Sequence, residues 1–444
     1  MLILQPLNEC TELNWNDYNL EKEPRCKEHY RILKLLCLSN GHGEDVIAVR
    51  ILEALRQYHP GVDIAALPIV GDGSAYQRSR IPLLTAGQPM PSGGFIYMDA
   101  KELWRDVRGG LIRLTLVQLQ AVRRWAKQGG IILAVGDIVP LLFARLSGTH
   151  YWFVGTAKSE YYLRDEVGWL PKTSRLEQIL GSVYLPWERC LMKPPRCQGV
   201  FARDTLTTQV LQQFRIPAYD FGNPMMDRMI PELPIAKESD QQRSLRVLLL
   251  PGSRSPEAER NWQFILDAVE NLMQREPKRR LSFLSAIAPS LILEPFCKTL
   301  QGRGWHPLPN PAAATVIPDK TGVAFQQGGT PLLVTQNAYH SCLLASDLAI
   351  AMAGTATEQF VGLGKPVIAF PGSGPQYTPA FAEAQTRLLG ASVILVKKPS
   401  QTADIFQELF TDPDRLQLIA DNGKQRMGKP GAASRIADCI FRFG

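Results

Sequence analysis

The order of apolar and polar positions after residue 31 predicts strands and helices in alternation. Residues 32–38 form an apolar run of strand length, and residues 44–58 then place apolar side chains at helical spacing. We expect Ile47, Ile51, Leu55 and Tyr58 to share one face of this helix. Further apolar runs predict strands at 64–70, 131–135, 151–154, 200–203 and 219–222, and a helix at 205–214.

The same alternation starts again after a polar, proline-bearing stretch. The second series predicts a helix at 257–275 and strands at 246–250, 281–287, 332–335, 348–352, 367–370 and 393–396. Unbroken apolar runs are typical of parallel strands that are buried on both faces, and strands alternating with helices are typical of open, doubly wound sheets. The sequence therefore predicts an α/β protein with two Rossmann-like, doubly wound parallel-sheet domains that face a cleft.

The predicted domain limits follow these patterns. An irregular N-terminal extension occupies 1–30, the first Rossmann-like domain 31–228, a linker 229–245 and the second Rossmann-like domain 246–425. Residues 426–444 are expected to form a C-terminal helix. The sequence leaves open whether this helix crosses back to the first domain.

The composition of the chain argues against several classes of protein. No apolar run reaches the roughly 18 residues that span a bilayer, and the first thirty residues carry six acids without an apolar core, which argues against a secretory signal. Eight cysteines without a zinc-type spacing, some inside apolar runs (Cys37, Cys342), predict reduced core thiols, a cytoplasmic location and no bound metal. The net charge of +7 comes without a basic tail, so we expect no nucleic-acid partner.

The glycine loop after the first predicted strand contains the first candidate site. Gly41 and Gly43 let the backbone approach an anionic ligand at a helix N-terminus, and Glu44 follows them. A dinucleotide fingerprint needs a third glycine where Val46 stands, so NAD is not expected, and we expect no other cofactor. His42 fits either a general base or an ordinary turn histidine.

A second candidate in this half is Asp137, which directly follows the strand predicted at 131–135. Ligands of open α/β sheets bind at the carboxyl ends of strands, so Asp137 fits a catalytic base. It fits a helix N-cap equally well, because Pro140 follows in what would be the first turn.

Two turns in the second series suit a phosphate. Gly252, Ser253 and Arg254 follow a predicted strand and combine backbone donors with a planar cation. Gly354 and Thr355 follow another strand at the expected start of a helix. The chain has no Walker loop, which argues against a P-loop NTPase.

Glu358 lies one helical turn after Thr355. Its carboxylate could accept hydrogen bonds from two sugar hydroxyls, or it could form a capping box with Thr355. The spacing fits both interpretations.

Taken together, four segments resemble those of lipid-A-disaccharide synthases, a family of GT-B glycosyltransferases, and occur in the same order. They are NGHGED at 40–45, FGNPMMD at 221–227, LLLPGSR at 248–254 and ASDLAIAMAGTATE at 345–358. The resemblance covers roughly residues 31–440 and is that of a divergent relative of the cyanobacterial type. His42 and the stretch 155–200 depart from the family pattern.

The resemblance implies roles for several residues. Arg254, Gly354, Thr355 and Glu358 would hold UDP, and Gly252 and Ser253 would line the diphosphate. Asp137 matches the aspartate proposed to act in catalysis in that family.

We therefore expect a metal-independent hexosyltransferase that moves a sugar of the GlcNAc or glucosamine type from a UDP-sugar to a lipid or lipophilic acceptor. Asp137 or His42 would deprotonate the acceptor. Two alternatives stay open: a UDP-sugar 2-epimerase and a non-catalytic sugar-nucleotide-binding protein. The sequence also leaves open whether the chain forms a homodimer.

A basic, apolar segment at 101–127 predicts contact with an anionic membrane surface. It carries seven Lys or Arg side chains against two acids, interleaved with Trp and Leu side chains. A peripheral position at the inner face of the membrane would suit a lipid acceptor. The competing interpretation is an ordinary crossover helix whose apolar face packs on the sheet.

Overall fold

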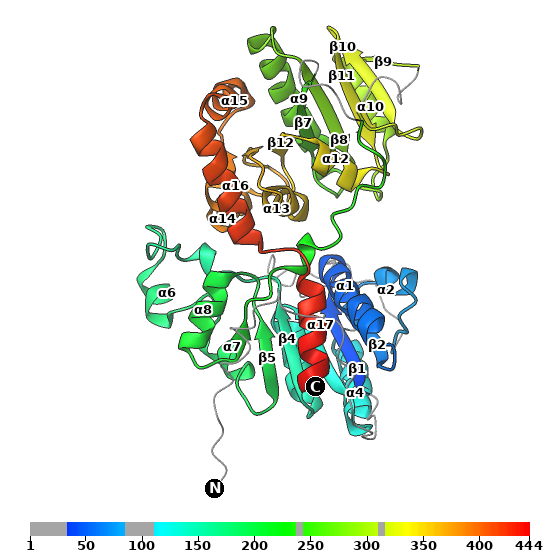
Figure 1. The fold of residues 1–444 in the computed structure, drawn as a ribbon, viewed down its shortest axis with the longest axis vertical. Coiled ribbons are helices and arrows are strands. Elements are labelled where there is room, and N and C mark those ends of the chain that lie inside the picture. The colour runs from blue at the N-terminus through cyan, green and yellow to red at the C-terminus, as the bar shows by residue number, and fades with distance from the viewer. Residues whose placement is uncertain (1–32, 85–110, 237–242, 310–315) are drawn as a thin grey trace, which may run out of the picture. The chain divides into compact units, whose positions relative to one another are not determined.

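The computed structural model describes residues 33–84, 111–236, 243–309 and 316–444, except for the side chains of His42 and of residues 111–114. Two sheets account for the described strands (Figure 1). Residues 33–444 form one unit that contains both sheets. The extension predicted at 1–30 lies outside the described residues, and the domain limits stay predictions.

The first sheet has six parallel strands in the order β2-β1-β3-β4-β5-β6. The strands are β1 Lys34–Asn40, β2 Asp63–Val70, β3 Ile131–Gly136, β4 Tyr151–Gly155, β5 Cys197–Phe201 and β6 Ala218–Tyr219. The helices in this part of the chain are α1 His42–Tyr58, α2 Ser74–Arg78, α4 Leu111–Lys127, α5 Ile138–Ser147, α6 Arg175–Leu180, α7 Pro186–Leu191 and α8 Thr205–Gln213.

Successive side chains of these strands enter opposite layers. In β1, Leu35 and Cys37 pack in one core with α1 and α2, whereas Leu36 and Leu38 pack in another with α4 and α5. This alternation places helices on both faces of the sheet, as the unbroken apolar runs predicted. Tyr58 is an exception to the predicted helix face: it is 57% exposed at the end of α1, beyond the edge of the core.

The second sheet has eight strands in the order β14-β13-β12-β7-β8-β11-β10-β9. The strands are β7 Leu245–Leu250, β8 Leu281–Ala286, β9 His306–Pro307, β10 Val323–Gln327, β11 Thr330–Thr335, β12 Leu348–Ala351, β13 Val367–Ala369 and β14 Val393–Leu395. Strand β10 pairs antiparallel with both β11 and β9 at one edge of the sheet; the other pairings are parallel.

Helices cover both faces of this sheet too. Helices α9 Glu257–Arg275, α10 Glu294–Gly302 and α15 Thr402–Thr411 contribute to one core. Helices α12 Tyr339–Ala345, α13 Thr355–Gly362 and α14 Pro379–Leu389 contribute to the other. Helix α16 Pro413–Met427 packs beside α13.

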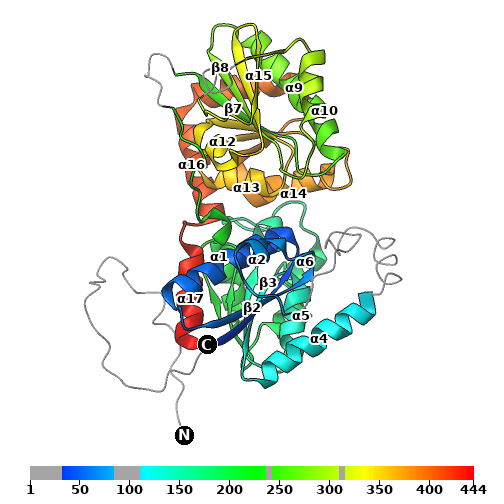
Figure 2. The ribbon, with the colours of Figure 1, turned by 90° about the vertical axis from the view of Figure 1, so that its right-hand side faces the viewer.

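The final helix, α17 Ala432–Phe443, belongs to the layer of the first sheet. Figures 1 and 2 both show it beside α1, and Ile436 and Ile440 are fully buried in the core that also holds Ile47 and Ile51. Asp227 caps its N-terminus by accepting hydrogen bonds from the backbone N–H groups of residues 431–433. The chain therefore returns to the first sheet after it has completed the second.

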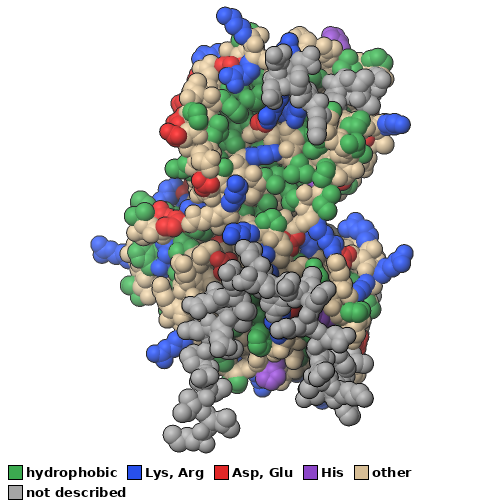
Figure 3. All heavy atoms as spheres, in the orientation of Figure 1, with side chains coloured by type: hydrophobic (Ala, Val, Ile, Leu, Met, Phe, Trp, Pro, Cys, Tyr) green, Lys and Arg blue, Asp and Glu red, His purple; other side chains and the backbone are tan. Residues whose placement is uncertain are grey.

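On the described part of the face in Figure 3, Lys and Arg side chains are scattered among Asp and Glu side chains. Cys37 and Cys342 are buried and free, as predicted for reduced core thiols. No helix among the described residues is long and apolar enough to cross a membrane.

Candidate functional site

The strand order of the first sheet reverses between β1 and β3, and the predicted residues of the first half lie at that point. Asp137 follows β3 and caps α5, where its Oδ1 accepts a hydrogen bond from the Val139 N–H at 2.9 Å. Asn40, at the end of β1, donates through Nδ2 to both Asp137 oxygens at 3.1–3.2 Å. The N-cap interpretation of Asp137 is thus confirmed, and its carboxylate is fixed from both neighbouring strands.

Glu44 lies beside Asp137 in space that two glycines leave free. A Cβ at Gly41 would lie 3.2 Å from Glu44 Oε2, and one at Gly136 would lie 3.2 Å from Glu44 Cγ. Both glycines have φ near +130°, a conformation that other residues rarely adopt. By contrast, Gly43 is exposed and has open space around it. Gly41 therefore shapes the site, whereas nothing in the structure requires Gly43.

The two carboxyl groups are less acidic than in water. Burial raises the pKa of Glu44 to about 7, and the nearby Asp137 and Asp45 charges add to the rise. Burial also raises the pKa of Asp137, while its hydrogen bonds with Val139 and Asn40 oppose that effect. A carboxyl group with a pKa near 7 can accept or donate a proton at neutral pH.

Asp45 and His42, the other ionisable residues of the loop, play different parts. Asp45 is fully buried and accepts a hydrogen bond from Ser39 Oγ at 2.5 Å, which in turn lies 2.5 Å from Tyr76 Oη. Asp45 therefore holds α1 against β1. His42 is the first residue of α1, and its side chain lies outside the described atoms, so its role as a base stays a prediction.

The second sheet has its own reversal of strand order, between β7 and β12. The two predicted phosphate turns follow these strands and touch. A Cβ at Gly252, where φ is +109°, would lie 3.3 Å from the Met352 carbonyl oxygen. Asn261 of α9 donates through Nδ2 to the carbonyls of Pro251 and Met352, at 2.9 and 3.5 Å. The sheet thus brings the two turns together at the position where open α/β sheets bind ligands.

The second of these turns does not form the capping box that the sequence allowed. Gly354 is the N-cap of α13, and Thr355 is already the first helical residue. The Glu358 N–H therefore bonds to the Gly354 carbonyl at 3.2 Å, as in an ordinary helical turn. Because Thr355 stands one position too late to cap, the Glu358 carboxylate is left for another partner.

In the phosphate turn that follows β7, Ser253 and Arg254 lie just before α9. The Ser253 carbonyl accepts a hydrogen bond from Ser290 Oγ at 3.3 Å. Burial lowers the pKa of Arg254, and the Glu257 carboxylate opposes this effect. Glu257 itself accepts from the Tyr377 N–H at 2.6 Å, so it ties the loop after β13 to the same region.

The partner of Glu358 is Arg203, a residue that sequence reasoning missed. Arg203 follows β5 of the first sheet, and its Nη2 lies 2.8 Å from Glu358 Oε2. Its Nη1 donates to the Thr156 carbonyl, just beyond β4, at 2.9 Å. Arg203 and Thr156 also line a small pocket with Asn223 and Met225. A strand had been predicted up to Arg203, but β5 ends at Phe201, which releases Arg203 into the loop.

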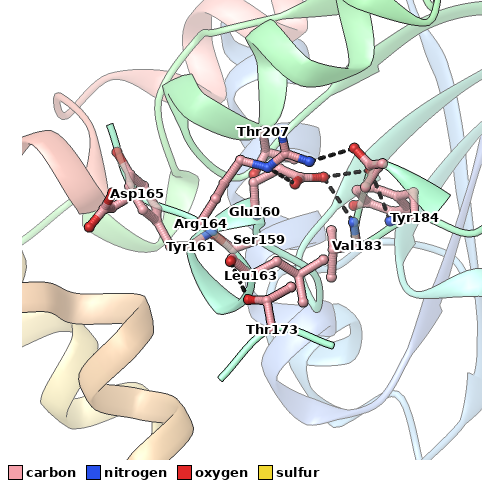
Figure 4. Close-up of polar contacts among 12 residues, drawn as sticks. Ser159, Glu160, Tyr161, Leu163, Arg164, Asp165, Thr173, Val183, Tyr184 and Thr207 are labelled. Carbon is pink, nitrogen blue, oxygen red and sulfur yellow. Dashed lines mark hydrogen bonds and ion pairs between the residues drawn. The ribbon is translucent and has the colours of Figure 1, made fainter. Parts of the chain in front are cut away.

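Buried acidic side chains hold the stretch 155–200 in place, which departs from the pattern of the segments compared above (Figure 4). Glu160 is fully buried, forms an ion pair with Arg164 at 3.0 Å, and accepts from the Val183 N–H at 2.9 Å. Lys158 pairs with Glu188 at 2.6 Å. The segment also reaches the second half, where Arg387 of α14 donates to the Tyr162 carbonyl.

No group of His, Cys, Asp and Glu side chains within the described ranges could hold a metal ion. The candidate site consists of an acidic pair beside the first sheet and two turns beside the second, and the Arg203–Glu358 ion pair joins the loop after β5 to α13.

Comparison with the sequences of known proteins gives a partial match. No protein-family model matches the chain. A lipid-A-disaccharide synthase from Solibacter usitatus is 28% identical over 169 residues, and this alignment spans 36% of each chain.

Solved structures match over nearly the whole chain. UDP-GlcNAc 2-epimerase from Neisseria meningitidis, bound to UDP-GlcNAc, has a TM-score of 0.53 and 15% identity, covering 92% of this chain and 100% of its own. The calicheamicin glycosyltransferase CalG4 has a TM-score of 0.53 and 13% identity, covering 93% and 98%. The fold is GT-B. This confirms the predicted α/β class with two Rossmann-like sheets, and at these identities the likeness concerns the fold alone.

Proposed function

We propose that this GT-B protein is a metal-independent glycosyltransferase that transfers a sugar of the GlcNAc or glucosamine type from UDP to a lipid or lipophilic acceptor. The observation that carries the proposal is the pair of turns at the β7–β12 reversal, with Glu358 one helical turn beyond them. The partial match to a lipid-A-disaccharide synthase supports the choice of acceptor class.

In this proposal the second sheet binds the donor. Backbone N–H groups of Gly252, Ser253, Gly354 and Thr355, together with the Arg254 guanidinium, surround the diphosphate. Glu358 accepts hydrogen bonds from the ribose hydroxyls. As the bond between the sugar C1 and the diphosphate oxygen breaks, the leaving oxygen gains negative charge that Arg254 and the two turns stabilise.

The first sheet supplies the base. The acceptor hydroxyl oxygen forms the new bond to C1, and its proton passes to the carboxylate pair of Asp137 and Glu44. Asn40 fixes Asp137 in place for this step. Gly41 lets Glu44 lie against the pair.

One experiment separates the three candidate functions. The chain is incubated with UDP-GlcNAc, with and without a lipid acceptor, and the products are identified by mass spectrometry. Release of UDP that depends on the acceptor supports the proposal. Binding of the nucleotide without turnover would indicate a sugar-nucleotide-binding protein.

Formation of UDP-ManNAc would instead indicate a 2-epimerase, and one observation favours this as the second candidate. Glu44 and Asp137 lie together as a pair of carboxyl groups with raised pKa, and epimerisation needs an acid and a base at one carbon.

The donor site is tested by Glu358→Ala. Loss of the carboxylate should weaken UDP binding by about 1–3 kcal/mol, the range for leaving a polar group without its hydrogen-bond partner. Glu383→Ala on α14 is a matched control, because Glu383 pairs with the exposed Lys172 outside the two turns. Equal UDP affinity of wild type and Glu358→Ala in calorimetry would contradict the donor-site assignment.

We also propose peripheral contact with an anionic membrane through α4. Val122 and Trp125 pack in the core, as the crossover-helix interpretation requires, while Leu116 and Val117 are about half exposed on the same helix. Arg124 and Lys127 are exposed as well. Basic and apolar side chains together suit the surface of an anionic bilayer. Residues 101–110 of the predicted segment lie outside the described residues.

This contact is tested by sedimentation with liposomes that contain phosphatidylglycerol. Arg124→Glu/Lys127→Glu should sediment less than wild type at low salt, by roughly 1 kcal/mol for each charge removed. Lys397→Glu/Lys398→Glu changes the charge equally on an exposed loop of the other half and should sediment like wild type. Equal sedimentation of all three proteins would remove the membrane role from α4.

A further inference from the structure

The Glu358 carboxylate is held on one side only. Its Oε2 lies 2.8 Å from Arg203 Nη2, and the two side chains are 12% and 6% exposed. No hydrogen bond joins its Oε1 to any residue within the described ranges. One oxygen of the carboxylate is thus engaged, and the other is available to a ligand.

Arg203 is itself fixed. The hydrogen bond from its Nη1 to the Thr156 carbonyl anchors the guanidinium on the loop after β4. Tyr162 is partly buried and lies close enough to interact electrostatically with both charges of the pair, and its backbone carbonyl accepts a hydrogen bond from Arg387. Because the guanidinium is planar, the anchored Nη1 also fixes the direction of Nη2, and so orients the carboxylate that Nη2 pairs with.

We propose that Arg203 is a positioning residue for nucleotide recognition: it holds Oε2 of Glu358 so that Oε1 can accept hydrogen bonds from the ribose hydroxyls. This rests on the proposed function. Displacement of Arg203 by the ribose is the less favourable arrangement, because a nearly buried guanidinium would lose its charged partner. The residue that positions the donor site thus comes from the first sheet.

If Arg203 has this role, it controls how well the site distinguishes ribose from a sugar that lacks the 2′ and 3′ hydroxyl groups. A site built to hydrogen-bond a hydroxyl group binds an analogue without that group poorly, since its polar atoms are then left unpaired. If Arg203 only stabilised the fold, its loss would weaken the binding of UDP and the binding of a deoxygenated analogue to the same degree.

The test compares UDP with 2′,3′-dideoxy-UDP by calorimetry on the full chain. Wild type should bind UDP about 10- to 100-fold more tightly than the analogue. Glu358→Gln should bring the ratio close to one, and Arg203→Met should reduce it at least tenfold while the affinity for the analogue changes little. Arg387→Met is the matched control: it removes a neighbouring arginine that does not touch Glu358, and it should keep the wild-type ratio.

The outcomes are distinct. An Arg203→Met protein that keeps the wild-type ratio, while Glu358→Gln loses it, overturns the role of Arg203 and leaves the donor site standing. A wild-type protein that binds neither nucleotide overturns the proposed function and this inference with it. If circular dichroism shows that Arg203→Met is unfolded, Arg203→Lys takes its place. Its shorter, non-planar cation should lower the ratio at least threefold, and an unchanged ratio counts against the proposal.

Discussion

Single side chains of the candidate site differ in how well the sequence could reveal them. Asp137, Glu44 and Glu358 were found because each follows an apolar run by a few residues, and strand ends are where such sheets bind ligands. Arg203 could not be found in the same way. Its importance comes from its ion pair with Glu358, which lies on α13 beside the second sheet, and no local pattern encodes that pairing.

Glu44 gives a prediction about pH. Its pKa in the folded protein, about 7, lies above the ordinary value of 4.5, so the folded state binds more protons than the unfolded state between these pH values. The stability that this group contributes is fully present below pH 4.5 and is lost as the pH rises to 7. We expect Glu44→Gln to raise the free energy of unfolding at pH 8 by at most about 3 kcal/mol.

Urea unfolding of both proteins at pH 5 and pH 8 checks this expectation. The gain from Glu44→Gln should be larger at pH 8 than at pH 5, whereas Glu408→Gln, at an exposed position of α15, should not produce such a difference. A gain of the same size at both pH values would show that Glu44 is not the group responsible.

Asp137 gives a prediction about turnover. Asp137→Asn keeps the shape of the side chain but removes its ability to take a proton, so sugar transfer should fall by 100-fold or more while UDP binding stays the same. Both are measured on one preparation, by UDP release and by calorimetry. If Asp137→Asn stays active and His42→Ala does not, the base is His42.

At the scale of elements, the apolar runs located the buried strands well, because a strand covered on both faces has to be apolar throughout. The same reasoning missed β9 and β10. These strands form the antiparallel end of the sheet, and β10 carries polar residues such as Gln326 and Gln327, so neither strand has an unbroken apolar run. Spacing alone also left the start of α13 open: the capping box that Thr355 and Glu358 allowed does not form, because the helix begins one residue earlier than that motif requires.

The start of α17 gives a prediction at this scale. Asp227 accepts three backbone hydrogen bonds there and is buried. Asp227→Ala leaves those N–H groups without partners, and we expect it to lower the free energy of unfolding by about 1–3 kcal/mol.

Urea unfolding measures the loss. Asp220→Ala is the control, since Asp220 bonds to Thr205 and Gly222 and not to α17. Losses of equal size in both variants would mean that the cap on α17 contributes no more to the free energy of unfolding than the hydrogen bonds of Asp220 do.

At the scale of the whole molecule, each sheet is built from its own continuous part of the chain, and α17 is the element that returns from the second part to the first. This helix fills the core beside α1, and Arg435 binds it to the loop after β6 by donating to the Phe221 carbonyl at 2.8–3.0 Å. The sequence left the position of this helix open because an amphipathic pattern shows that a face is buried but not against which partner.

We expect the first sheet to need α17 in order to fold. Residues 33–228 alone should fail to give a cooperative urea transition, because Ile47, Ile51 and Leu55 lose part of their cover. Residues 33–228 joined through a short Gly-Ser linker to 429–444 should regain that transition, since Gly222 lies against Lys429 in the full chain.

The control for this experiment is the joined chain with Ile436→Asp and Ile440→Asp, which places charges in the core and should abolish the transition. Cooperative unfolding of residues 33–228 without α17 would contradict the expectation.

The return of α17 to the first sheet has a consequence for synthesis on the ribosome. Translation proceeds from the N-terminus, and domains generally fold as they emerge. Here the first sheet emerges early, yet the helix that covers α1 is made only after all strands of the second sheet. During that interval the apolar side chains of α1 that α17 covers are exposed to water. A nascent chain paused before residue 432 should therefore bind chaperones, and release should coincide with the emergence of α17.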